Sequence, residues 1–259
     1  MTVAGSLTVL VLAGSRQGAT DPMATAAHVS HKALLPVGGT PMLLRVIRAL
    51  RASPEVGRII VSSERTDLLD GISEASEVLS IRAESSPSSS VAAAFAAFGA
   101  PLLVTTADHA LLSSVILAEF LSRAPESADG VAAVARADVI RAAFPGTQRT
   151  WFRLRDGDFS GCNLFLLRTP KASRAVAFWR RLEEQRKSPL AMAWLIGPGA
   201  LIGYALRILT LDGVARLLSR RTGAALAVIA LSHADAAIDV DKPADLELVE
   251  RTLAARAAA

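Results

Sequence analysis

The sequence predicts an α/β domain built on a mostly parallel, mixed β-sheet. Short apolar runs typical of strands alternate with longer segments of helical periodicity. The apolar runs lack polar alternation, which is typical of strands buried on both faces of a sheet. The chain has 259 residues, 51% of them hydrophobic, and no linker long enough to separate two domains. One domain is therefore expected.

The first half of the chain carries the regular alternation. Leu7–Leu12 is a continuous apolar run that ends at Ala13-Gly14, and a long loop over residues 14–31 follows. A helix is expected from Thr40-Pro41 to about Arg51, because apolar residues recur at helical spacing and Pro is favoured in a first turn. The remaining elements expected here are strands at 58–62, 78–81, 101–105 and 130–135 and helices at 85–98 and 113–123.

The regular alternation of strands and helices is interrupted in the second half of the chain. Residues 150–155 and 162–167 flank Asp156-Gly157, a pair favoured in the turn of an antiparallel hairpin. The elements expected after the hairpin are a helix at 171–187, an apolar stretch at 189–218, a strand at 225–230 and a helix from about Pro243.

Composition excludes several classes of protein. Cys162 is the only cysteine, which excludes an internal disulfide and a multi-cysteine zinc site, and the four histidines show no metal-ligand spacing. Arginine makes up 24 of the 28 basic residues, but no basic stripe with interleaved aromatic residues is present, so no nucleic-acid partner is expected. The N-terminal apolar run lacks a preceding basic region and favours a strand over a signal peptide, so a reducing cytoplasm is expected.

Candidate ligand-binding residues follow the predicted strands, as expected for open α/β sheets. The first segment is Leu12-Ala13-Gly14-Ser15-Arg16, in which small residues let backbone N–H groups approach phosphate oxygens and the Arg adds charge-assisted hydrogen bonds. The glycine patterns of a P-loop and of a dinucleotide fingerprint are absent. Alone, such a turn is more often ordinary loop chemistry than a ligand site.

The second segment, HKALLPVGGTPML at residues 31–43, is more specific. With the preceding Leu-Ala-Gly turn, it resembles the start of the MobA-like nucleotidyltransferase superfamily. That group includes molybdenum-cofactor, sugar-phosphate and cytidylyl nucleotidyltransferases. The resemblance implies a three-layer α/β/α, Rossmann-like fold of the nucleotide-diphospho-sugar transferase type, as a single domain over residues 1–259. It does not extend to the segment around 189–221, which is expected to be an apolar helical insertion in that domain.

The resemblance also implies roles for individual residues. The loop from Leu12 to Arg16 would wrap the triphosphate, and Lys32 and Arg16 would contact phosphate as catalytic residues. Ser15 stands where the family usually has a second glycine, and the Arg comes sooner than usual. The alternative for Lys32 is a solvated loop lysine.

Three aspartates are candidate metal ligands. Asp108 follows the strand at 101–105. It resembles the family aspartate that holds the catalytic Mg²⁺, or Mn²⁺, beside the nucleotide. The alternative role for Asp108 is that of N-cap of the helix from Ser113. Asp239 and Asp241 alternate along an extended segment that resembles the closing family motif. Carboxylates on one face repel each other unless a cation lies between them, which favours a metal. Asp245 is expected to stabilise the first turn of the last helix.

Two further segments resemble weaker family features. Ser89 and Ser90 open a helix where cytidylyltransferases contact the nucleobase or ribose, although serines there also serve as N-caps. Asn163 lies on a strand that resembles the acceptor-side strand, and we expect it to contact the acceptor.

The expected activity is metal-dependent transfer of a nucleoside monophosphate, with CMP preferred, from the triphosphate to a phosphorylated small molecule or lipid precursor. Pyrophosphate would be released. The alternatives are a metal-dependent glycosyltransferase of the GT-A type that uses a nucleotide-sugar, and a non-catalytic nucleotide-binding regulatory domain. No oligomeric state is predicted.

The apolar stretch Trp194–Leu211 leaves two interpretations open. Gly197-Pro198-Gly199 and Arg207 interrupt it, which argues against a membrane span. It forms either a pair of core helices that cover the sheet or, with its flanking arginines and lysines, an interfacial surface for a lipidic acceptor or the inner face of the membrane.

Overall fold

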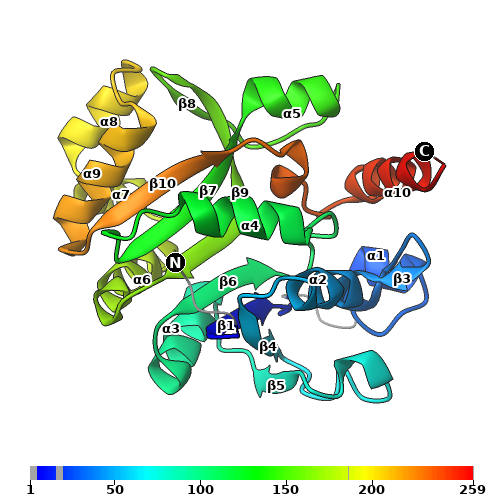
Figure 1. Ribbon diagram of the computed structural model, residues 1–259. Coiled ribbons are helices and arrows are strands. Elements are labelled where there is room, and N and C mark those ends of the chain that lie inside the picture. The colour runs from blue at the N-terminus through cyan, green and yellow to red at the C-terminus, as the bar shows by residue number, and fades with distance from the viewer. Residues whose placement is uncertain (1–4, 16–19, 186, 259) are drawn as a thin grey trace.

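The computed structural model describes residues 5–15, 20–185 and 187–258, and this part of the chain is organised around an eight-stranded mixed sheet (Figure 1). The strand order is β10-β7-β9-β6-β1-β4-β5, and β8 pairs with β9. All neighbours are parallel except those of β9, which is antiparallel to β6, β7 and β8. The mostly parallel, mixed sheet that the sequence predicts is confirmed. The strands of this sheet are β1 Leu7–Leu12, β4 Val56–Ser63, β5 Leu79–Arg82, β6 Leu102–Thr106, β7 Gly130–Arg136, β8 Phe152–Leu154, β9 Gly157–Leu167 and β10 Leu226–Leu231.

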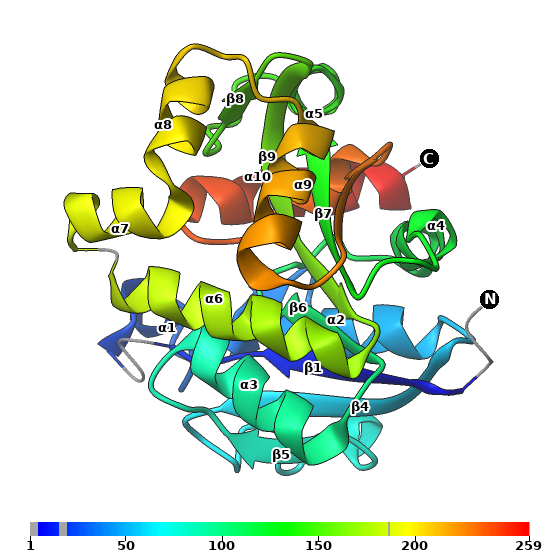
Figure 2. The same cartoon turned by 90° about the vertical axis from the view of Figure 1, so that its left-hand side faces the viewer.

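Helices cover both faces of the sheet and complete the three layers (Figures 1 and 2). Val9 and Val11 of β1 belong to the core that includes α2 and α4, whereas Leu10 belongs to the core that includes α3 and α6. Successive side chains of a strand point to opposite faces, so a strand covered on both sides must be apolar throughout. The helices are α1 Pro22–Ala26, α2 Met42–Arg51, α3 Pro87–Phe98, α4 Ser114–Arg123, α5 Ala137–Ala143, α6 Ser173–Glu184, α7 Pro189–Ile196, α8 Pro198–Ala205, α9 Leu211–Thr222 and α10 Pro243–Ala257.

The structure adds short elements that periodicity does not reveal. α1 lies inside the stretch expected to be a loop, and α5 directly follows β7. Residues Thr40-Pro41 form strand β3, which pairs with β2 (Pro36–Val37), so α2 begins only at Met42. These elements are shorter than the windows over which a period of 3.6 or 2 residues can be recognised.

The apolar stretch after α6 forms α7, α8 and the start of α9, but α7 and α8 do not cover the sheet. The Trp194 side chain is 76% exposed and that of Ile202 is 59% exposed. The interpretation as a pair of core helices is therefore wrong for these large side chains, whereas Ala200 of α8 is buried. Within the described residues, no helix is both long and apolar enough to cross a membrane.

Candidate active site

The loops that follow β1, β4 and β6 meet at one edge of the sheet. Ala13 N–H donates to the Ser62 carbonyl at 2.8 Å, and Ala107 N–H donates to the Leu12 carbonyl at 2.9 Å. The Asp108 carbonyl accepts from Val240 N–H at 3.0 Å, which attaches the closing segment to the same edge. The candidate residues were predicted to follow the strands of the sheet. These backbone hydrogen bonds bring the segments that carry them together at its carboxyl edge.

Lys32 lies between the carboxylates of two predicted site residues. Its Nζ is 3.0 Å from Asp241 Oδ1 and 3.8 Å from Asp108 Oδ2. Lys32 opens a short 3-10 helix, Lys32–Leu34, whose N-cap is His31. The Lys32 side chain is only 19% exposed, so the interpretation as a solvated loop lysine does not fit.

Asp108 is held in an environment that disfavours its charge. Burial raises the pKa of the Asp108 carboxyl to about 6; the nearby Lys32 ammonium opposes this shift, and Asp241 and Asp239 add to it. Its Oδ1 atom is buried without a hydrogen-bond partner. Burial lowers the pKa of Lys32, but Asp108 and Asp241 more than offset that effect, so the pKa lies above its ordinary value and Lys32 is a cation at neutral pH.

The N-cap interpretation of Asp108 is wrong. The N-cap of α4 is Ser113, whose hydroxyl accepts from Ile116 N–H at 3.3 Å. Asp108 therefore has no capping role, and the Lys32 ammonium is the cation beside it. Asp245 lies in the first turn of α10, and its carboxylate accepts from the backbone N–H groups of Asp241 and of the N-cap residue Lys242 at 3.2 and 3.1 Å.

Asp239 points away from Lys32 toward a second pair of groups. Its carboxylate pairs with Arg149 and accepts from Asn163 Nδ2 at 3.3 Å. Burial raises the pKa of Asp239, and Arg149 opposes that shift. These groups line a pocket of about 300 Å³ together with Gln148, Thr150, Phe152, Ser160, Gly161, Asp241, Lys242 and Asp245. Asp239 and Asp241 both line this pocket, but their carboxylates pair with different cations, Arg149 and Lys32 respectively.

Arg149 is a site residue that the sequence analysis missed. Its guanidinium is 7% exposed, pairs with Asp239 and lies 3.4 Å from Asp245. In a chain with 24 arginines, no local pattern distinguishes it.

We expect Arg149→Met to lower the free energy of unfolding by about 3 kcal/mol, because it leaves two largely buried carboxylates without their cation. Urea denaturation measures this, with Arg153→Met on the exposed part of β8 as the matched control. Equal stability of the two variants would show that Arg149 does not hold this segment.

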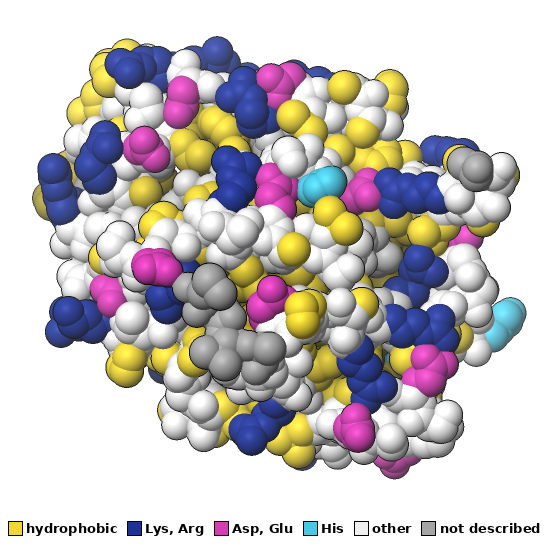
Figure 3. Space-filling view, in the orientation of Figure 1, with side chains coloured by type: hydrophobic (Ala, Val, Ile, Leu, Met, Phe, Trp, Pro, Cys, Tyr) yellow, Lys and Arg dark blue, Asp and Glu magenta, His cyan; other side chains and the backbone are white. Residues whose placement is uncertain are grey.

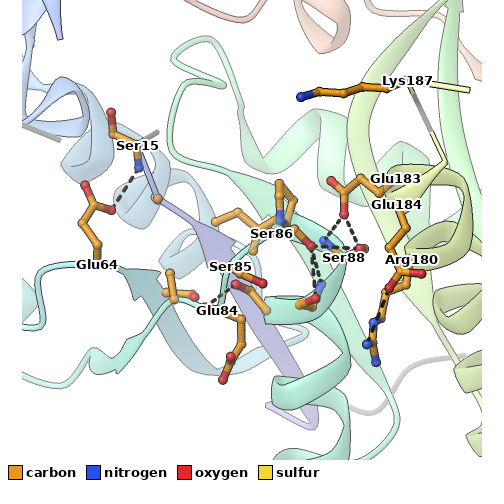
Figure 4. Close-up of a pocket in the computed structure, with 17 residues that line it drawn as sticks. Ser15, Glu64, Glu84, Ser85, Ser86, Ser88, Arg180, Glu183, Glu184 and Lys187 are labelled. Carbon is orange, nitrogen blue, oxygen red and sulfur yellow. Dashed lines mark hydrogen bonds and ion pairs between the residues drawn. The ribbon is translucent and has the colours of Figure 1, made fainter. Parts of the chain in front are cut away.

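A larger cavity of about 680 Å³ adjoins the loop after β1. Figure 4 shows Ser15 and Glu64 on one side of it and Glu183, Glu184 and Lys187 on the other. The other residues that line it are Leu12, Gly14, Ser62, Ala83, Glu84, Ser85, Ser86, Pro87, Ser88, Ser89, Ser90 and Arg180. The described residues predicted to bind nucleotide thus fall into two groups, because Leu12, Gly14, Ser15, Ser89 and Ser90 line this cavity whereas Lys32 and Asp108 lie at the aspartate cluster. Ala13 lies between Leu12 and Gly14 in the same loop and donates to the Ser62 carbonyl, and Arg16 lies outside the described residues.

The serines at the start of α3 have separate tasks. Ser86 is the N-cap and accepts from Ser89 N–H at 3.2 Å, so Ser89 and Ser90 are not caps. The Ser90 hydroxyl accepts from Glu84 N–H at 2.9 Å and is almost buried, which makes it a support for the cavity wall. Ser88 hydrogen-bonds Glu183 and joins α3 to α6. Ser89 is the more accessible of the two predicted contacts.

Glu64 and His31 position the loop after β1, and sequence reasoning missed both. Glu64 Oε2 accepts from Ser15 N–H at 3.0 Å, and its Oε1 lies 3.0 Å from His31 Nε2 (Figure 4 shows the first contact). His31 Nδ1 accepts a hydrogen bond from Ala33 N–H at 3.0 Å, so the ring proton is on Nε2. The Nε2–H group then donates a hydrogen bond to Glu64 Oε1. Glu64 follows β4, so its position after a strand was the available signal.

A metal would have to be held by few protein ligands. Among the described residues, no group of three or more His, Cys, Asp or Glu side chains is arranged to hold a metal ion. The Asp108–Asp241 pair offers two carboxylates, one with a buried oxygen that lacks a partner.

Comparisons with known proteins show the family and the fold. The sequence profile of the MobA-like NTP transferase domain matches residues 9–225. No curated protein matches the chain. A hypothetical transferase structure from Thermus thermophilus is 30% identical, with a TM-score of 0.81, over 92% of this chain and 98% of that one.

Two more distant structures share the fold. A 2-C-methyl-D-erythritol 4-phosphate cytidylyltransferase, also from Thermus thermophilus, is 16% identical with a TM-score of 0.54, over 97% of this chain and all of that one. The 4-diphosphocytidyl-2C-methyl-D-erythritol synthase from Anaerococcus prevotii is 9% identical with a TM-score of 0.58, over 96% of this chain and 98% of that one. The profile match begins within β1 and ends at the residue before β10, so it includes Lys32 and Asp108. The chain belongs to the MobA-like NTP transferase family and is a nucleotidyltransferase.

Proposed function

We propose that the protein transfers a nucleoside monophosphate, with CMP preferred, from a nucleoside triphosphate to a phosphorylated acceptor. The observation that carries this proposal is the cluster of Lys32, Asp108 and Asp241 at the carboxyl edge of the sheet. Asp241 opens onto the pocket of about 300 Å³, and the loop after β1, bonded to the segment that bears Asp108, opens onto the cavity of about 680 Å³. The larger cavity would take the nucleotide and the smaller one the acceptor.

The reaction needs no covalent enzyme intermediate. An oxygen of the acceptor phosphate attacks the α-phosphorus, the bond from that phosphorus to the bridging oxygen breaks, and pyrophosphate leaves with the electron pair. No proton has to move in this step. Catalysis then consists of positioning the two substrates and neutralising their negative charge. Lys32 supplies a permanent cation for this purpose.

The residues fit a divalent cation, Mg²⁺ or Mn²⁺. Mg²⁺ in nucleotide sites is bound by one or two carboxylates and completed by phosphates and water. Asp108 and Asp241 would hold it, because the partnerless oxygen of Asp108 and the mutual repulsion of the carboxylates are both relieved by a cation. Asp239 would support the site less directly, because Arg149 and Asn163 already engage its carboxylate. Bound there, the ion would neutralise charge on the α-phosphate.

The carboxylates that line the larger cavity favour some nucleobases over others. Glu64, Glu84 and Glu184 line it, and ionised carboxylates only accept hydrogen bonds. Cytosine, adenine and guanine carry an exocyclic amino group that donates, whereas uracil presents carbonyl oxygens in its place. This favours an amino-bearing base, and within that class the resemblance of Ser89 and its neighbours to cytidylyltransferases favours cytosine.

A thermal-shift comparison of the four ribonucleoside triphosphates with Mg²⁺ tests this choice. We expect CTP to raise the melting temperature most and UTP least. Pyrophosphate release would then be measured with CTP alone and with a panel of sugar, polyol and pterin phosphates and phosphorylated lipid precursors. Pyrophosphate release that requires a phosphorylated acceptor supports the proposal. Release of a nucleoside diphosphate from a nucleotide-sugar with an unphosphorylated acceptor, and no pyrophosphate release from any triphosphate, would contradict it.

The smaller pocket suits a phosphorylated acceptor. Lys242 brings a positive charge to it beside the aspartates, and Gln148, Thr150 and Asn163 bring amide and hydroxyl groups that can bind a polar acceptor. Asn163 has a φ of 48°, a left-handed conformation that asparagine tolerates better than most residues. We therefore retain Asn163 as an acceptor contact.

A further inference from the structure

The helices α7 and α8 form a hydrophobic surface that is open to solvent. Residues 189–206 contain no charged side chain. Trp194, Ile202 and Leu206 are 76%, 59% and 64% exposed. Leu201, Tyr204 and Ile208 are exposed as well. Single exposed hydrophobic residues are normal on a protein surface, but a contiguous group of them marks an interaction site.

Positive charge is concentrated in the sequence on both sides of these helices. Residues 180–221 contain eight Lys and Arg against three Asp and Glu, a net charge of +5, whereas the whole chain carries +4. The rest of the chain is therefore slightly acidic. The Arg221 guanidinium of α9 packs against Gly197, at the joint between α7 and α8, which brings a cation to the apolar surface. Figure 3 shows basic side chains beside hydrophobic ones over α8 and α9.

We propose that the α7–α8 surface docks the protein on an anionic lipid bilayer. The basic residues that flank the two helices, among them Lys187, Arg207 and Arg221, are called the basic rim here. A bilayer surface offers negative headgroups to this rim and an acyl region to the apolar side chains. Trp194 and Tyr204 are residue types that favour the membrane–water interface. Each helix has eight residues and is about 12 Å long, so the two would lie in the interface and not cross a hydrocarbon core of about 30 Å.

The charge pattern disfavours a second copy of the chain as the occupant. In a symmetric dimer through this surface, two rims of the same positive charge would face each other. An anionic bilayer meets the same rim with opposite charge. The proposal does not depend on the nucleotidyl transfer proposed above, because its test measures binding to lipid without nucleotide or acceptor.

The test is flotation of the full-length protein with phosphatidylcholine vesicles, with and without phosphatidylserine, at low and high salt. We expect binding only to the vesicles that contain phosphatidylserine, and weaker binding at high salt. Tryptophan emission should shift to shorter wavelength on binding, and Trp194→Phe should abolish most of that shift. Absence of wild-type binding to the anionic vesicles at low salt would overturn the proposal.

Two matched variants separate this surface from a general effect. Ile202 on α8 and Val115 on α4 are both 59% exposed, so Ile202→Asp and Val115→Asp make comparable changes in charge and apolar area at different places. We expect Ile202→Asp to weaken binding to the anionic vesicles at least about tenfold and Val115→Asp to leave it within about twofold. Equal effects of the two variants would refute the assignment of the surface.

The basic rim is tested separately. The double variant Lys187→Gln with Arg207→Gln should weaken binding at low salt by about tenfold or more, because each basic residue near an anionic bilayer contributes about fivefold. No change in this variant would contradict the electrostatic part of the proposal. Sedimentation velocity distinguishes the other occupant: a dimer that Ile202→Asp dissociates, without lipid binding by the wild type, would show that a second copy covers this surface.

Discussion

Replacing Asp108 by asparagine is expected to abolish most nucleotidyl transfer and to make the free protein more stable. The amide keeps the size of the side chain but cannot supply the negative charge that holds a divalent cation. We expect kcat to fall by about a thousandfold, the scale on which loss of one well-placed electrostatic group affects enzymes. Pyrophosphate release measures this fall, and a rate near that of the wild type would contradict the assignment of Asp108.

The stability gain follows from the pKa of Asp108, which rises from an ordinary value of 3.8 to about 6 in the folded protein. The folded state therefore binds the proton more tightly than the unfolded state. The stabilising contribution of the protonated carboxyl is fully present below the ordinary pKa and is lost as the pH rises through the folded pKa. Above that pH the ionised carboxylate costs roughly 2 to 3 kcal/mol, which the neutral amide avoids.

Urea denaturation of the free protein on both sides of this pH range measures the gain. The variant should be more stable than the wild type near neutral pH and similar to it near pH 4, and added Mg²⁺ with nucleotide should stabilise only the wild type. Asp67→Asn is the control, because Asp67 is an exposed carboxyl whose pKa is lowered by a hydrogen bond from Arg65. A variant of Asp108 that is less stable than the wild type at neutral pH would show that the carboxylate is not strained.

Lys32→Met is the second variant with a large expected effect. It preserves most of the apolar stem but removes the ammonium that lies 3.0 Å from Asp241 and 3.8 Å from Asp108. We expect kcat/KM for the triphosphate to fall by about a hundredfold to a thousandfold, because the phosphates lose a fixed cation and meet two carboxylates whose charge Lys32 no longer balances. Steady-state pyrophosphate release measures this.

The matched control for Lys32 is Lys171→Met, at an exposed lysine outside both cavities. It should leave kcat/KM within about twofold. Lys32→Arg should recover little, because a planar guanidinium does not reproduce the compact ammonium between two carboxylates. Full activity in Lys32→Met would end the proposal that this cluster is the catalytic centre.

Much of the fold could be predicted from local patterns. The strands β1, β6 and β7 are continuous apolar runs because both faces of the sheet are covered, and α2 shows its buried face at helical spacing. The hydrophobic pattern of these four elements is local, so their observed boundaries differ from the expected ones by at most two residues. α1 and α5 were missed, since five and seven residues are too few to show a period.

The candidate site could be predicted in part for a similar reason. Lys32, Asp108 and Asp241 each lie in a recognisable segment, and the rule that ligands bind at the carboxyl edge of an α/β sheet places those segments together. The partners of these residues could not be predicted. Arg149 meets Asp239, and Glu64 joins Ser15 to His31, through contacts between segments far apart in the chain.

The alternation of strands and helices, the family and the three residues of the charged cluster can be recognised in the sequence, because each depends on a short run of neighbouring side chains. The folded structure is needed to show that Asp241 faces Lys32, that Asp239 faces Arg149, and that the large apolar side chains of α7 and α8 are exposed. Both helices are apolar on all sides, so the hydrophobic pattern of the sequence does not distinguish a helix buried in the core from one exposed at the surface. Exposure and ion pairing depend on what the rest of the chain places opposite a residue, and that is a property of the folded molecule.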